Sequence, residues 1–155
     1  MKKNKFKNII FDWSGVIKDV SESHLWIVNK MFKKMGGKEI TLSEMRENWE
    51  EPYMIFWNKY FPEMTIEKEL EMYTGAIMSP SCPDSEPYPG ITELIKKLKN
   101  RGNFLAVISF DLPATVLPEI KKFGLENIFD QVITYATDKG ELIKKLIKRK
   151  NLNPK

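Results

Sequence analysis

The sequence has very little cysteine and histidine and no long apolar segment. Cys82 is the only cysteine among 155 residues, so no disulfide can form within the chain, which fits a reducing cytoplasm. His24 is the only histidine and lies far from Cys82 in the sequence, so neither a thiol–histidine pair nor a zinc site is indicated. No apolar run approaches the roughly 18 residues that a membrane-spanning helix requires. These absences favour a cytoplasmic protein that does not cross a membrane.

The charge of the chain does not indicate nucleic-acid binding. Hydrophobic residues make up 42% of the sequence and charged residues 30%, which is typical of a globular protein, and the formal net charge is +4. The lysines alternate with glutamates along helical patterns, as they do on solvated helix faces, and form no basic stripe with a recognisable motif. The expected partner is therefore a small anionic substrate.

The first half of the sequence predicts one strand followed by a helical insertion. The apolar run 7–13 is typical of a buried strand. Helical spacing predicts helices over 21–35, 41–49, 52–60 and 65–78, of which the second begins with the capping-box pair Thr41 and Glu44. The segment 79–90 contains four prolines, so we interpret it as a linker.

After the linker, strands alternate with amphipathic helices. The patterns predict helices over 91–102, 111–123 and 139–150, the second with Asp111 as its N-cap, and strands over 104–109 and 131–135. Alternation of this kind produces a parallel sheet with right-handed crossovers. The expected fold class is α/β, with a Rossmann-like parallel-sheet core from residues 1–16 and 88–155 and an inserted α-helical cap from residues 17–87.

Three polar side chains are expected at one edge of this sheet. Asp12 follows the first strand, Ser109 the second, and Lys139 begins the helix after the third. The carboxyl ends of parallel strands meet at one edge, where ligands of open α/β folds bind. A carboxylate can attack phosphorus, a hydroxyl can hydrogen-bond a phosphoryl oxygen, and an ammonium can neutralise charge, so the set suits phosphoryl transfer. Purely structural roles, as turn or helix-start residues, remain open for all three.

These motifs resemble those of the haloacid dehalogenase-like superfamily. The segment IIFDWSGVI is similar to its first motif, an apolar strand followed by Asp-x-Asp-Gly-Thr/Val; LAVIS resembles the second motif and Lys139 the third. The helical insertion is similar to the four-helix cap of the phosphoglycolate-phosphatase type. The resemblance implies a phosphohydrolase that cleaves small phosphorylated metabolites through an aspartyl phosphate at Asp12.

The resemblance also implies roles for individual residues. Asp12, Ser14, Ser109 and Lys139 correspond to catalytic positions, and Ser109 and Lys139 also bind phosphate. The Asp12 carboxylate and the Ser14 backbone carbonyl would hold Mg²⁺. Gly15 allows the tight turn after the strand and could bring its backbone close to phosphate, whereas Trp13 could contact substrate or cap, or pack locally.

Ser14 departs from the family pattern, which has a second aspartate there as general acid/base. Loss of such assistance typically costs ~10²–10⁴-fold in rate. Ser14 therefore favours slow hydrolysis, a good leaving group or another reaction. One such reaction is phosphonatase-like carbon–phosphorus cleavage, because phosphonoacetaldehyde hydrolases carry a similar Asp-Trp-Ala-Gly sequence; Lys30 or Lys33 of the cap would then form a Schiff base.

The end of the sequence is a second departure. It stops at NLNPK, where the strand of the fourth motif should begin, so the C-terminal part of the core and its acidic metal loop are expected to be missing. Asp138 would be a substitute ligand, and Mg²⁺ binding is expected to be weak or absent. The alternatives are a truncated or non-catalytic protein, or a homo-oligomer in which a second copy covers the open sheet edge.

Overall fold

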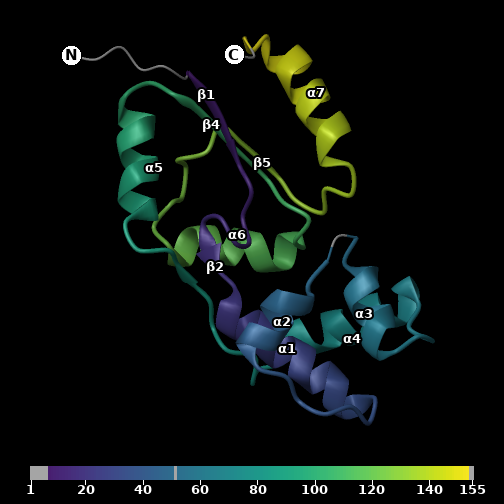
Figure 1. The fold of residues 1–155 in the computed structure, drawn as a ribbon. Helices are drawn as coiled ribbons and strands as arrows, with labels where there is room; N and C mark the ends of the chain where they lie inside the picture. Colours follow the sequence, from purple (N-terminus) through teal and green to yellow (C-terminus); the bar gives the residue numbers. More distant parts are fainter. Residues whose placement is uncertain (1–6, 51, 154–155) are drawn as a thin grey trace. The chain divides into compact units, whose positions relative to one another are not determined.

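The computed structural model describes residues 7–50 and 52–153, which form two compact units. The core unit contains the residues up to Asp19 and from Glu86 onward, and the cap unit is Val20–Ser85 (Figure 1). The expected boundaries were residues 16/17 and 87/88. The difference arises because β2 (Lys18–Asp19) pairs antiparallel with β3 (Glu86–Pro87), a short ribbon that belongs to the core unit and that sequence patterns did not predict.

The core unit contains the expected parallel sheet. Its strands are β1 (Asn8–Phe11), β4 (Phe104–Ile108) and β5 (Gln131–Ile133), in the order β1-β4-β5. Both pairs are parallel, with Phe11 opposite Val107 and Ile108 opposite Ile133. The predicted α/β class is therefore confirmed, and the carboxyl ends of the three strands lie at one edge.

Helices cover both faces of this sheet: α5 (Ile91–Asn100), α6 (Pro113–Lys122) and α7 (Lys139–Lys150). Side chains of a strand alternate between faces. Leu105 and Val107 of β4 accordingly pack with Ile95 of α5 in one buried cluster, whereas Ile108 packs with Leu146 of α7 in another. Figure 1 shows α5 and α7 on opposite sides of the sheet.

The cap unit consists of four helices, of which the second and the fourth begin with a side-chain cap. They are α1 (Ser21–Lys34), α2 (Leu42–Asn48), α3 (Met54–Tyr60) and α4 (Ile66–Ile77). Thr41 accepts a hydrogen bond from the Glu44 N–H, and the Glu44 carboxylate accepts one from the Thr41 N–H, so the predicted capping box is confirmed. Thr65 caps α4 in the same way by accepting from the Lys68 N–H.

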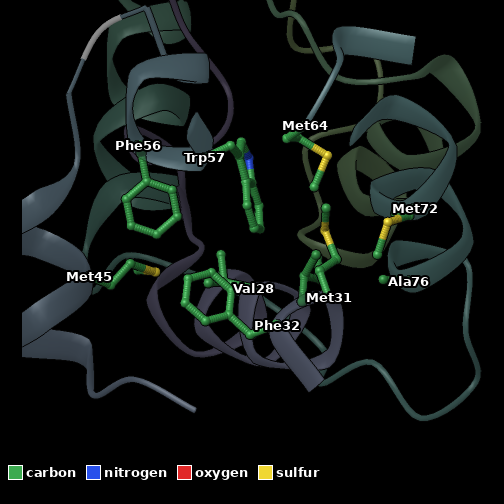
Figure 2. Packing of buried hydrophobic residues seen from close by; sticks show 10 residues of the cluster. Val28, Met31, Phe32, Met45, Phe56, Trp57, Met64, Met72 and Ala76 are labelled. Atoms are coloured by element: carbon green, nitrogen blue, oxygen red, sulfur yellow. The ribbon is translucent and has the colours of Figure 1, made fainter. Parts of the chain in front are cut away.

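Aromatic and methionine side chains fill the core of the cap unit. Figure 2 shows Phe32 of α1 below Phe56 and Trp57 of α3, with Met31 and Met72 beside them. The ring centroids of Phe32 and Trp57 are 5.7 Å apart. Phe32, Phe56 and Trp57 are thus core residues of the cap unit. Among the residues described, none of the helices combines the length and hydropathy that crossing a membrane would require.

Candidate active site

The sheet edge brings Asp12 and Lys139 into direct contact. Asp12 directly follows β1, and Lys139 is the first residue of α7. The Lys139 Nζ donates to Asp12 Oδ2 at 2.5 Å, and both side chains are 38% exposed. The second carboxylate oxygen, Oδ1, accepts a hydrogen bond from the Trp13 backbone N–H at 2.8 Å. The carboxylate is therefore oriented at both oxygens, beside a cation and within reach of solvent.

A second cluster at this edge joins Ser14 and Ser109 through Asp111. The Ser14 hydroxyl donates to Asp111 Oδ2 at 2.5 Å, and the Ser109 hydroxyl donates to the same oxygen at 3.1 Å. The Asp111 N–H in turn donates to Ser109 Oγ at 3.1 Å. Three polar side chains from the ends of β1 and β4 are thus connected within the core unit.

The role predicted for Asp111 was wrong. It was expected to cap the following helix, but the N-cap of α6 is Leu112, which makes no side-chain capping bond, and Pro113 occupies the first turn. The Asp111 carboxylate contacts the two serines instead. The signal that could have found it is its position two residues beyond Ser109, where a carboxylate at the end of a parallel strand lies at the ligand-binding edge.

Trp13 links the candidate site to the buried core beside it. Its side chain is fully buried and stacks on Phe123, with ring centroids 5.6 Å apart. Its indole N–H donates to Glu119 Oε2 at 2.6 Å, while the ammonium of Lys18, itself buried, donates to Glu119 Oε1 at 3.1 Å. The side chain of Trp13 thus packs locally, and its backbone N–H contacts Asp12. Sequence reasoning missed both Glu119 and Lys18.

Gly15 provides the turn between β1 and β2. Its φ of +75° lies in the left-handed region, and no atom lies within 4 Å of where a Cβ would be, so backbone conformation rather than crowding requires glycine. Its N–H donates to the Lys18 carbonyl oxygen at 2.8 Å. The amide is therefore used within the turn in this conformation.

The donor set at the edge has the chemistry that Mg²⁺ prefers but is small. Within residues 7–50 and 52–153, no group of three or more His, Cys, Asp or Glu side chains could hold a metal ion. Asp138, the suggested substitute ligand, caps α7 by accepting from the Glu141 N–H at 2.9 Å. Mg²⁺ often binds through one or two carboxylates while keeping several waters and contacting substrate phosphates. The Asp12 carboxylate and the Ser14 carbonyl fit this sparse type of site.

Comparison with known proteins identifies the family. The model of the haloacid dehalogenase-like hydrolases matches residues 9–155. The chain belongs to this family. The match runs from within β1 through the cap unit to α7, so the resemblance inferred from the motifs around Asp12, Ser109 and Lys139 is confirmed.

Individual relatives of this haloacid dehalogenase-like chain are distant. Pyrophosphatase PpaX of Halalkalibacterium halodurans is 36% identical over 59 residues, which are 38% of this chain and 26% of that protein. A haloacid dehalogenase-like family hydrolase from Streptococcus pneumoniae superimposes with a TM-score of 0.78 at 16% identity, covering 97% of this chain and 72% of that chain. A structure described as a predicted phosphoglycolate phosphatase from Haemophilus somnus gives 0.76 at 17% identity, with 97% and 74% covered. At such identities the structures show a shared fold.

Proposed function

We propose that this chain is a phosphohydrolase that cleaves small phosphorylated metabolites through an aspartyl phosphate at Asp12. The observation that supports the proposal most directly is the ion pair between Lys139 and Asp12 at the carboxyl edge of the sheet. The hydrogen-bonded cluster of Ser14, Ser109 and Asp111 lies at the same edge. Cys82 is the single cysteine of the sequence, so no disulfide can form within the chain, which suits a protein of the reducing cytoplasm.

The residues divide the work of phosphoryl transfer between them. An oxygen of the Asp12 carboxylate forms a bond to phosphorus while the bond from phosphorus to the leaving oxygen breaks. Lys139 neutralises charge on both the carboxylate and the phosphoryl group, and the Ser109 hydroxyl turns from Asp111 to a phosphoryl oxygen. Water then releases phosphate from Asp12. Positioning and charge stabilisation of this kind provide most of the catalysis in phosphoryl transfer.

Mg²⁺ is the proposed cofactor. The Asp12 carboxylate and the Ser14 backbone carbonyl would hold it, and when bound it would offset the negative charge of the phosphoryl group. Lys139 already provides one positive charge at the same carboxylate.

The test is phosphate release by the full chain from phosphate esters with good leaving groups in the presence of Mg²⁺. Borohydride trapping followed by peptide mass spectrometry should detect a reduced acyl phosphate at Asp12. Asp12→Asn should lower release to background and remove the modification. Glu126→Gln is the matched control, since Glu126 is an exposed carboxylate of the core unit.

The same measurements, repeated with a phosphonate substrate, distinguish the alternatives. Phosphate release that survives Asp12→Asn would end the proposal. If borohydride reduction leaves a stable adduct of the phosphonate substrate on a cap lysine, carbon–phosphorus cleavage is indicated instead. Of the two candidate lysines, Lys30 donates to Ser79 Oγ at 3.0 Å and its Nζ lies 4.4 Å from the Trp26 ring centroid. No turnover and no trapped intermediate would support a non-catalytic protein.

A further inference from the structure

Asp111 is the carboxylate that the proposed mechanism has not yet used. Its Oδ2 accepts hydrogen bonds from the hydroxyls of both Ser14 and Ser109, and the shorter of the two, 2.5 Å, is the one from Ser14. The backbone around Asp111 is held firmly, because its carbonyl oxygen accepts from the Tyr135 N–H at 2.8 Å and its own N–H donates to Ser109 Oγ. The carboxylate is half-buried, so solvent reaches the cluster.

Ser14 by itself cannot assist hydrolysis, since a hydroxyl is a poor proton acceptor at neutral pH. A serine hydroxyl has one proton to donate and two lone pairs to accept with. Here that proton is directed to Asp111, which leaves the lone pairs of Ser14 Oγ to accept a hydrogen bond from a water. Because the Asp111 carboxylate can take up the Ser14 proton, the Ser14 hydroxyl oxygen becomes a better base toward water, as in other general-base catalysis.

We propose that Ser14 and Asp111 form a two-residue proton relay that activates the water hydrolysing phospho-Asp12. This proposal rests on the function proposed above. The water oxygen forms a bond to phosphorus, and the bond from phosphorus to the Asp12 oxygen breaks. The water proton passes to Ser14 Oγ while the original Ser14 proton passes to Asp111 Oδ2. Asp111 then loses the proton to solvent, and inorganic phosphate leaves.

Asp111 is thus a positioning and proton-accepting residue that acts through Ser14. The family pattern has its general acid/base carboxylate at the position of Ser14, on the loop after β1. In the relay the carboxylate is that of Asp111, on the loop after β4 and 97 residues from Ser14 in the sequence. We therefore expect the relay to matter more for the loss of phosphate from Asp12 than for its addition, because a good leaving group departs without accepting a proton.

The experiment separates the two half-reactions. The full chain and its variants are phosphorylated with ³²P-labelled acetyl phosphate and Mg²⁺, unlabelled acetyl phosphate is added in excess, and loss of label from Asp12 is followed. Asp111→Asn and Ser14→Ala should each still accept label and should each slow its loss by roughly 10²–10⁴-fold, the range for general-base assistance. The double variant should be no slower than either single one, because the residues act as a unit.

Rescue distinguishes a relay from a merely structural role. In Ser14→Asp/Asp111→Asn a carboxylate stands at position 14 and can contact the water directly, so loss of label should recover to within about 10-fold of the unmodified chain, a small deficit on the general-base scale. A structural role for Asp111, such as holding Ser109, would not be rescued at position 14. Glu126→Gln should decay at the unmodified rate.

Three results would overturn the relay, and the third would also overturn the proposed function. If label is lost from Asp111→Asn at the unmodified rate, Asp111 takes no part, although Asp12 remains the nucleophile. If loss is slow in Asp111→Asn and stays slow in Ser14→Asp/Asp111→Asn, Asp111 is structural. Failure of Asp12 to accept label in the unmodified chain would overturn the proposed function, and the relay with it.

Discussion

Replacement of Glu119 by glutamine should destabilise the core unit because one carboxylate satisfies two buried donors. Glu119 accepts from the Trp13 indole N–H and from the Lys18 ammonium, through different oxygens. Glutamine has one oxygen and one NH₂ group. In Glu119→Gln one of these donors must therefore face another donor, and the buried charge of Lys18 loses its counter-charge.

The size of the effect follows from burial. The Lys18 side chain is 4% exposed and the Glu119 side chain 18%, with 3.1 Å between Nζ and Oε1. At an effective dielectric constant of about 20, two unit charges at such a distance attract by about 5 kcal/mol before desolvation is counted. Removing one partner of a buried pair costs ~3–5 kcal/mol. Because Glu119 is partly solvated and glutamine keeps one hydrogen bond, we expect a loss of about 2–3 kcal/mol.

Hydrogen exchange of the β4 amides measures this loss in the core unit alone. These amides lie in the centre of the sheet between β1 and β5, so the slowest of them exchange through opening of the whole unit. A loss of about 2–3 kcal/mol corresponds to exchange about 30- to 150-fold faster. Amides of the cap unit should be much less affected, since Glu119, Trp13 and Lys18 all belong to the core unit.

The matched control is an exposed ion pair in the same unit. Lys122 Nζ lies 2.7 Å from Glu86 Oε1, but the two side chains are 42% and 68% exposed. Exposed pairs contribute ~0–1 kcal/mol, so Glu86→Gln should accelerate β4 exchange by less than about 5-fold. Equal acceleration in Glu119→Gln and Glu86→Gln would refute the reasoning from burial.

Two further predictions concern the cap unit. Burial raises the pKa of Glu69 to about 7 from an ordinary value of 4.5, against an opposing hydrogen bond from Trp57, so the free energy of unfolding should fall as pH rises between these values and level off above them. Urea unfolding across this range should show the fall in the unmodified chain and not in Glu69→Gln; a matching fall in both would exclude Glu69 as its source. Thr41→Ala removes one half of the α2 capping box and should cost about 1 kcal/mol of cap stability in the same assay, whereas Ser43→Ala, on the exposed side of α2, should cost less; equal losses would argue against the cap.

Local features of this protein were readable from the sequence. The capping box of Thr41 and Glu44 spans three residues, and the helix of residues 139–150 was predicted at the bounds it has. Hydrogen bonds and side-chain periodicity of this range depend only on neighbours in the chain. The expectation that Asp12 and Lys139 would share a sheet edge needed only one further rule, that parallel strands end on the same side.

The tertiary structure alone decided which polar side chains pair across the chain. Trp13 and Glu119 are 106 residues apart, and Ser14 and Asp111 are 97 apart. In the sequence Asp111 was as good a helix cap as a site residue, and Lys18 was one lysine among many. Such a side chain can cap a helix, lie in solvent or contact a distant partner. Which of these occurs depends on how β1 pairs with β4 and on how α6 packs against the sheet, and both are decided by the packing of whole elements.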